Sequence, residues 1–229
     1  MINRTQLTLV AFLIATGCAG EAHLDNGEPR GVREETGLKL NFSPLQEELF
    51  SHPGAQTNAW ADYDGDGDLD LFVGFRNAPN RLYRNDQGSF VDVGLEAGLA
   101  VEAETRAAAW GDYDLDGDPD LYVGFAALGI DNRLYRNDEG SFTDVAGELG
   151  IGQSGTTRQP AFVDYDGDGD LDLFVAFRDR PNTLFRNDGT SFQNVTAESN
   201  IGDSRRTVGV AWFDMDNDGD LDAFTANQN

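Results

Sequence analysis

An aspartate-rich motif of nine residues occurs four times and sets the organisation of the chain. The first copy, at residues 62–70, reads Asp-Tyr-Asp-Gly-Asp-Gly-Asp-Leu-Asp. All copies have Asp at positions 1, 3, 5, 7 and 9 and Gly at position 6; the others are residues 112–120, 164–172 and 214–222. Successive copies lie about 50 residues apart. A period of this length is typical of propellers and other repeat arrays.

The motif predicts a calcium site. Carboxylates at alternate positions, with Gly at a sharp turn, direct several hard oxygen ligands at one cation. Without a cation, four carboxylates about 5 Å apart repel by about 5 kcal/mol in water, and the motif has no Lys or Arg to offset this. Oxygen ligands disfavour zinc and copper, and Mg²⁺ requires a stricter octahedron. The alternative is a solvated acidic turn, but four copies in one phase favour metal, at about four Ca²⁺ per chain.

The motif differs from other known calcium loops. An EF-hand has a bidentate Glu at position 12 and flanking helices, whereas position 12 here is Val73, Val123, Val175 or Thr225 and the flanks are short apolar runs typical of strands. A β-roll has tandem nonapeptides, whereas this chain has one motif per repeat.

The charge limits the partners. The net charge is −25, and the motifs, with five aspartates in each of four copies, supply about half of the 41 acidic residues. This acidity excludes nucleic acid as an expected partner. An anionic membrane is expected as a partner only through a lipid anchor.

The N-terminal region predicts export. Residues 1–17 have a basic start and a short apolar core, as in a signal peptide. Ala15-Thr16-Gly17-Cys18 resembles a bacterial lipoprotein cleavage box, with Ala where Leu is usual, so Cys18 is a candidate lipid anchor. The alternative is ordinary secretion with an unmodified cysteine. Residues 18–37 are polar and predict a flexible tether.

Residues 38–229 predict an all-β propeller of four-stranded antiparallel blades. Each unit has an apolar strand before the motif, a second after it, an alternating third strand, an Asn-Asp turn with a following Gly, and a fourth strand. The repeats span about 58–105, 106–157 and 158–205, with a partial repeat at 206–229. Trp60, Trp110, Phe162 and Trp212 precede the motifs. We expect them to pack between blades; the alternative is stacking on a ligand.

The two ends of the repeat region carry incomplete units. Residues 42–49 match residues 142–149 in phase and predict the outer strand of a first blade, while the last repeat stops before its third strand. If the N-terminal strand paired with the partial last repeat, the two incomplete units would form one blade and close a ring. We favour the other interpretation, a fragment of a larger propeller.

The repeats resemble the FG-GAP/VCBS class found in integrin α-subunits and, more closely, in bacterial relatives of cartilage acidic protein. The resemblance rests on the Asp-rich motif, on Asn-Arg-Leu-Tyr-Arg-Asn-Asp at 80–86 and 132–138, and on the Ser-Phe-x-Asp-Val strand, and it covers about residues 42–229. The Phe-Gly and Gly-Ala-Pro signatures of integrin repeats are poorly matched, and the ASPIC/UnbV module that often ends the bacterial proteins has no counterpart in this sequence.

The resemblance implies how calcium is bound. In that class the ion lies in the hairpin between the first two strands of a blade, held by the side chains at motif positions 1, 3, 5 and 9 and by the carbonyl of position 7. The implied side-chain ligands are Asp62, Asp64, Asp66, Asp70, Asp112, Asp114, Asp116, Asp120, Asp164, Asp166, Asp168, Asp172, Asp214, Asp216, Asp218 and Asp222. The implied carbonyl ligands are Asp68, Asp118, Asp170 and Asp220; spacing alone leaves their carboxylates open as ligands.

The expected function is a non-catalytic, extracytoplasmic calcium-binding module that binds a protein or a glycan. The alternative is a propeller-fold hydrolase or lyase acting on polysaccharide or phosphoester. The sequence has no Ser-His-Asp signature or histidine cluster, and its carboxylates are largely assigned to metal, so we predict no catalytic residue. Arg84, Arg136 and Arg186 recur in phase. We expect them to pair with nearby aspartates, with anion binding as the alternative.

Overall fold

The computed structural model describes residues 45–126 and 129–228. The chain forms two compact units, residues 1–51 and 52–229. The first unit contributes one described element, helix α1 (Glu47–Phe50). The predicted signal peptide, the tether, Cys18 and the first three residues of the predicted outer strand (42–44) lie outside the described residues. Residues 47–49 of that predicted strand are helical instead, because they belong to α1. No helix in the described part of the chain is long and apolar enough to cross a bilayer.

The second unit is all-β, as predicted, and each sheet is an antiparallel meander. The first sheet contains β1 (Ala55–Ala61), β2 (Asp70–Phe75), β3 (Arg81–Asp86) and β4 (Ser89–Asp92). The second contains β5 (Thr105–Gly111), β6 (Asp120–Phe125), β7 (Arg133–Asp138) and β8 (Ser141–Asp144). The third contains β9 (Thr157–Val163), β10 (Asp172–Phe177), β11 (Thr183–Asn187) and β12 (Phe192–Asn194). The fourth has two strands, β13 (Arg206–Phe213) and β14 (Asp222–Gln228). Three complete blades and one partial blade are thus confirmed.

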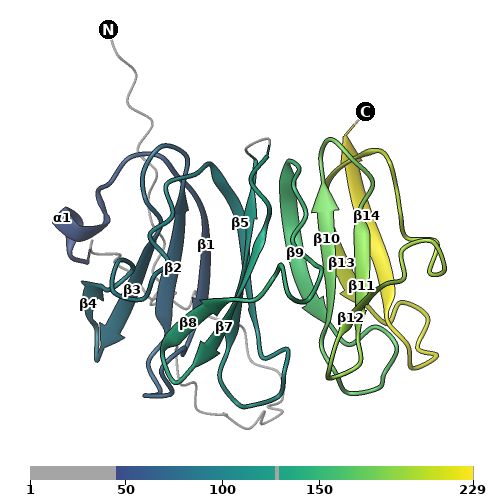
Figure 1. The fold of residues 1–229 in the computed structure, drawn as a ribbon, viewed down its shortest axis with the longest axis horizontal. Helices are drawn as coiled ribbons and strands as arrows, with labels where there is room; N and C mark the ends of the chain where they lie inside the picture. Colours follow the sequence, from purple (N-terminus) through teal and green to yellow (C-terminus); the bar gives the residue numbers. More distant parts are fainter. Residues whose placement is uncertain (1–44, 127–128, 229) are drawn as a thin grey trace, which may run out of the picture. The chain divides into compact units, whose positions relative to one another are not determined.

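The core lies between successive sheets. The first strands of neighbouring sheets contact each other, β1 with β5, β5 with β9 and β9 with β13 (Figure 1). One buried cluster joins Tyr63 and Phe72 of the first repeat to Leu121 and Val123 of the second, and equivalent clusters fill the next two junctions. Such face-to-face burial is how blades that cannot bury their own surfaces are stabilised.

The recurring aromatics pack between sheets, as predicted, with one exception. Trp110 stacks on Tyr63 of the preceding repeat at 6.4 Å between ring centroids, and Trp212 meets Phe174 edge to face at 5.6 Å. Trp60 instead contacts Phe90 of its own sheet and is 44% exposed. The exception arises because no sheet among the described residues precedes the first one.

The outer face of the last sheet is uncovered. Phe224 occupies the place of Phe72, Tyr122 and Phe174, which are fully buried, yet it is 65% exposed. Each of those three residues is covered by the sheet that follows its own, and no described sheet follows β14.

In the first two sheets, the hairpin between the third and fourth strands turns later than predicted. Asn85 and Asp86 end β3, and the turn is centred on Gln87 and Gly88, with φ of 55° and 89°. Positive φ at both central residues is the tight hairpin geometry whose twist matches the flanking strands. Glu139 and Gly140, with φ of 51° and 85°, form the same turn in the second sheet.

Candidate metal sites

Each aspartate motif connects the first two strands of its sheet, as the sequence predicts. β1 ends at Ala61 and β2 begins at Asp70, so the first motif forms the loop between them. Gly at position 6 has φ between 93° and 101° in all four loops, a region in which a side chain is strained. Position 4 is also left-handed, and there the second loop has Leu115, at φ 58°.

Backbone hydrogen bonds fix the carboxylates at positions 1 and 5. In the first loop, Asp62 Oδ2 accepts from the N–H of Gly67 at 2.9 Å, and Asp66 Oδ1 accepts from the N–H of Asp68 at 2.8 Å. The same two bonds recur in the other three loops. These bonds use one oxygen of each carboxylate. In the second and third loops the other oxygen of position 1 also accepts a hydrogen bond, from the N–H of Asp116 and of Gly167.

Three carboxylates in each loop bring oxygens within 4.8 Å of one another. The groups are Asp62, Asp64 and Asp66; Asp112, Asp114 and Asp120; Asp164, Asp166 and Asp172; and Asp214, Asp216 and Asp218. Each group could hold a metal ion. Positions 1 and 3 belong to every group, whereas positions 5 and 9 belong to two groups each.

Buried carboxylate oxygens without a partner fit a cation at these sites. Oδ1 of Asp62, of Asp114 and of Asp214 is buried and accepts no hydrogen bond from any residue that the structure describes. A buried, unsatisfied anionic oxygen is costly, and a coordinated cation would remove that cost. Because all nearby donors are carboxylate oxygens, the chemistry suits a hard cation.

In the first two loops, the side chain at position 7 turns away from the group. Asp68 Oδ2 accepts from the N–H of Gln87 and Asp118 Oδ2 from the N–H of Glu139, both at 2.8 Å. These carboxylates hold the turn between the third and fourth strands. They are absent from the four convergent groups among the described residues.

The aspartate at position 9 ties the loop to the third strand. Asp70 is fully buried; its Oδ2 accepts from the N–H of Tyr63 at 3.1 Å and its Oδ1 from the N–H of Asn85 at 2.8 Å. Asp120 and Asp172 make the same pair of bonds. Burial raises the pKa of Asp70 to about 6, of Asp120 to about 7 and of Asp172 to about 6, despite these bonds.

Two asparagines that the sequence analysis assigned to turns connect the loops of different sheets. Asn137 Nδ2 donates to the carbonyl of Tyr63 at 2.8 Å and to that of Pro119 at 3.1 Å. Asn187 Nδ2 repeats this arrangement with Tyr113, at 2.7 Å, and Leu171. The sequence signal that could have revealed this role is that the two asparagines occupy the same position in successive repeats.

The recurring arginines of the third strand follow the prediction in two sheets of three. Arg84 pairs with Asp86 at 3.1 Å and Arg136 with Asp138 at 2.9 Å. Arg186 instead donates to the side-chain oxygen of Gln193 at 2.8 Å, so the expectation of an aspartate partner is wrong there.

The antiparallel sheets stack face to face, and each carries an acidic loop between its first two strands. This arrangement defines a repeat protein built from propeller-like blades. A sequence profile of the FG-GAP-like repeat matches residues 42–123, 129–175 and 164–225. The chain therefore belongs to the FG-GAP-like repeat family. A search of curated proteins found no significant match.

Proposed function

We propose that the protein is a non-catalytic, calcium-stabilised interaction module that works outside the cytoplasm and binds a protein or a glycan. The observation that carries the calcium assignment is the set of buried, unpartnered carboxylate oxygens on Asp62, Asp114 and Asp214. Two findings support an interaction scaffold: the chain belongs to a repeat family, and its acidic loops could hold metal ions. In this proposal the loops bind calcium and other surfaces of the sheets bind the partner.

Calcium is the preferred ion because of the donors and their support. Each candidate site offers several carboxylate oxygens on a short loop with two left-handed residues. Ca²⁺ accepts six to eight oxygens in a flexible shell, whereas Mg²⁺ retains its waters and a stricter geometry. The side chains at positions 1, 3, 5 and 9 would hold the ion, with the carbonyl of position 7 as the resemblance implies.

The ion would stabilise contacts between sheets as well as its own loop. Asn137 and Asn187 bond to main-chain carbonyls of the preceding aspartate loop. A loop fixed by calcium would present that carbonyl in one position, so ion binding at one sheet would support the next junction.

The structural hydrogen bonds of the aspartates support a non-catalytic role. Those at positions 1, 5, 7 and 9 accept backbone hydrogen bonds that hold loops and hairpins. Export and lipid attachment at Cys18, and a closer relation to the bacterial cartilage acidic protein-like group, belong to the same proposal and rest on sequence resemblance.

Thermal unfolding of the full chain tests the proposal. We expect a large rise in melting temperature with Ca²⁺, a smaller one with Mg²⁺, and none with calcium plus excess chelator, because a ligand of the native state stabilises it. Asp114→Asn should reduce the calcium-induced rise. Glu148→Gln, which removes an equal charge from an exposed side chain, should not. An identical melting temperature in calcium and in chelator would refute the proposal.

A further inference from the structure

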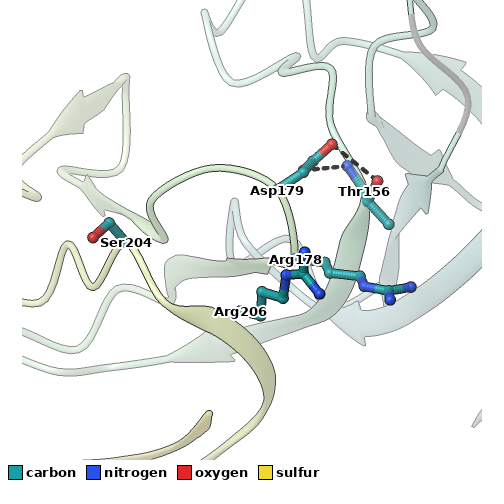
Figure 2. A pocket seen from close by; sticks show the side chains of 5 residues that line it. All are labelled: Thr156, Arg178, Asp179, Ser204 and Arg206. Carbon is teal, nitrogen blue, oxygen red and sulfur yellow. Dashed lines mark hydrogen bonds between the residues drawn. The ribbon is translucent and has the colours of Figure 1, made fainter. Parts of the chain in front are cut away.

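Two arginines line a hollow at the strand ends opposite the aspartate loops. Arg178 directly follows β10 and Arg206 begins β13, whereas the aspartate motif of the third sheet joins the end of β9 to the start of β10. The hollow has a volume of about 530 Å³ and is also lined by Thr156, Asp179 and Ser204 (Figure 2). A third arginine, Arg158 in β9, lies close enough for the charges of Arg178 and Arg106 to act on it.

These arginines lack an anionic partner. Among the described residues, the side chains of Arg158, Arg178 and Arg206 form no ion pair and no hydrogen bond. Nε of Arg158 is buried and unpartnered. Burial, together with the charges of Arg178 and Arg106, lowers the pKa of Arg158. An uncompensated cationic cluster is unexpected in a chain with a net charge of −25.

The one acid in the hollow is engaged elsewhere. Asp179 Oδ1 accepts from the N–H of Thr156 at 2.7 Å, and its Oδ2 accepts from the Thr156 hydroxyl at 2.9 Å. Figure 2 shows these two bonds, with the carboxylate directed at Thr156. Asp179 therefore holds the loop before β9 and forms no ion pair with either arginine of the hollow.

The corresponding junction between the first and second sheets is neutralised within the chain. Arg76 directly follows β2 as Arg178 follows β10. Glu104 pairs with Arg76 at 3.2 Å and also with Arg106. The carboxylate of this glutamate lies between two arginines, so that junction needs no external anion.

Strand register shows that Arg206 stands where Glu104 stands. Thr105 pairs with Phe125 and Thr207 with Asn227, each partner being five residues after the position-9 aspartate of its motif. Glu104 and Arg206 immediately precede these threonines. The same structural position therefore holds an acid, Glu104, between the first and second sheets and a base, Arg206, between the third and fourth sheets.

We propose that Arg178 and Arg206, the two arginines that line this hollow, bind the carboxylate or sulfate groups of an acidic glycan. This inference rests on the proposed function and assigns its partner site. Arginine binds planar oxyanions through paired N–H donors. The lining is entirely polar, and the hydroxyl of Ser204 makes no hydrogen bond within the described residues. A peptide partner would call for the apolar anchor pockets that dominate protein interfaces, and this hollow has none.

Direct binding measurements on the full chain in calcium test the site. The probes are an oligogalacturonate, a sulfated oligosaccharide of similar length, a neutral oligosaccharide, polyglutamate and inorganic sulfate. We expect either acidic oligosaccharide to bind, with an affinity that falls as salt rises, and the neutral one not to bind. The two acidic probes distinguish carboxylate from sulfate as the recognised group.

Variants connect the binding to the named arginines. Arg206→Glu recreates the arrangement of Glu104 and should reduce affinity for the acidic oligosaccharide about tenfold or more, as should Arg178→Gln. Arg76→Gln, the matched change at the neutralised junction, should leave affinity within about twofold. Three results would overturn the inference: unchanged glycan affinity in Arg206→Glu, tighter binding of polyglutamate than of either acidic glycan, or binding of inorganic sulfate without binding of either acidic oligosaccharide.

The calcium-induced rise in melting temperature, measured on the same samples, separates the two proposals. If that rise is present and no acidic glycan binds, this inference fails and the calcium module stands. If the rise is missing while Arg206-dependent glycan binding persists, the calcium proposal fails and the arginine site stands.

Discussion

The side-chain amide of Asn137 donates a hydrogen bond to the main-chain carbonyl of Tyr63, 74 residues earlier in the chain, at 2.8 Å. The bond joins the third strand of the second sheet to the aspartate loop of the first, and Asn137 is fully buried. Because the bond is buried, water does not replace it if it is lost. The carbonyl of Tyr63 and one N–H of the Asn137 amide would lose this partner, while the second N–H would still donate to Pro119. The aspartate loop of the first sheet is therefore tied directly to the second sheet.

Asn137→Ala should reduce the free energy of unfolding by about 1–3 kcal/mol, the usual cost of leaving buried polar groups unsatisfied. Urea unfolding in calcium measures it. Asn85→Ala is the matched control: Asn85 Nδ2 donates to the carbonyl of Leu69 in its own loop at 3.0 Å, and within the described part of the chain its side chain has no bond to another sheet. An equal loss in both variants would contradict a special role for the inter-sheet bond.

The aspartates at positions 3 and 9 should respond differently to substitution. Asp120→Ala leaves the N–H groups of Tyr113 and Asn137 without acceptors, and it should destabilise the fold by about 1–3 kcal/mol or more even without metal. Asp114→Asn should be neutral or stabilising in chelator, because it removes repulsion, and destabilising in calcium relative to the wild type. Chemical unfolding of both variants in each buffer measures this. Destabilisation by Asp114→Asn in chelator as large as that in calcium would count against a metal-binding role for Asp114.

The metal-free protein should lose stability as pH rises from about 4 to about 7. Burial raises the pKa of Asp120 to about 7, so the folded state binds its proton more tightly than the unfolded state does, and deprotonation in this window disfavours the fold. Unfolding of exhaustively dialysed protein at fixed ionic strength measures the slope. Asp120→Asn, which cannot titrate, should give a shallower slope; an equal slope would remove Asp120 as a cause.

Leu115→Gly should stabilise the second loop. Leu115 has φ 58°, a left-handed conformation that costs a side chain about 1–2 kcal/mol, whereas the first and third loops have Gly65 and Gly167 at this position. After allowance for the greater flexibility of glycine in the unfolded chain, we expect a gain of about 0.5–1 kcal/mol. Gly117→Ala, at φ 101°, should be destabilising instead. Urea unfolding of both variants in calcium tests the pair, and a loss of stability in Leu115→Gly would contradict the strain argument.

The sequence allowed the repeated sheets and the position of the loops to be predicted because both follow local periodicity. Motif spacing placed residues 62–70 between the first two strands, where the structure has them. It could not reveal that Asn137 reaches Tyr63, because that bond depends on how two sheets stack. The exposure of Trp60 likewise depends on whether a neighbouring sheet covers it.

The spacing of the motif alone did not separate the roles of its individual positions, although the family resemblance assigned position 7 to its carbonyl. Positions 5 and 7 both carry Asp, yet Asp66 belongs to a convergent group and Asp68 turns to the hairpin at Gln87. The partner of Arg186 was mispredicted because its choice between an acid and Gln193 is made by side-chain geometry on the sheet.

Equilibrium dialysis of the full chain against micromolar to millimolar Ca²⁺, with bound metal counted per chain, tests the central claim most directly. Four convergent groups predict saturation near four ions, falling to near three in Asp114→Asn. Binding of no calcium at millimolar concentration, or the same stoichiometry in the wild type and in a variant with Asn at positions 1 and 3 of all four loops, would contradict the account.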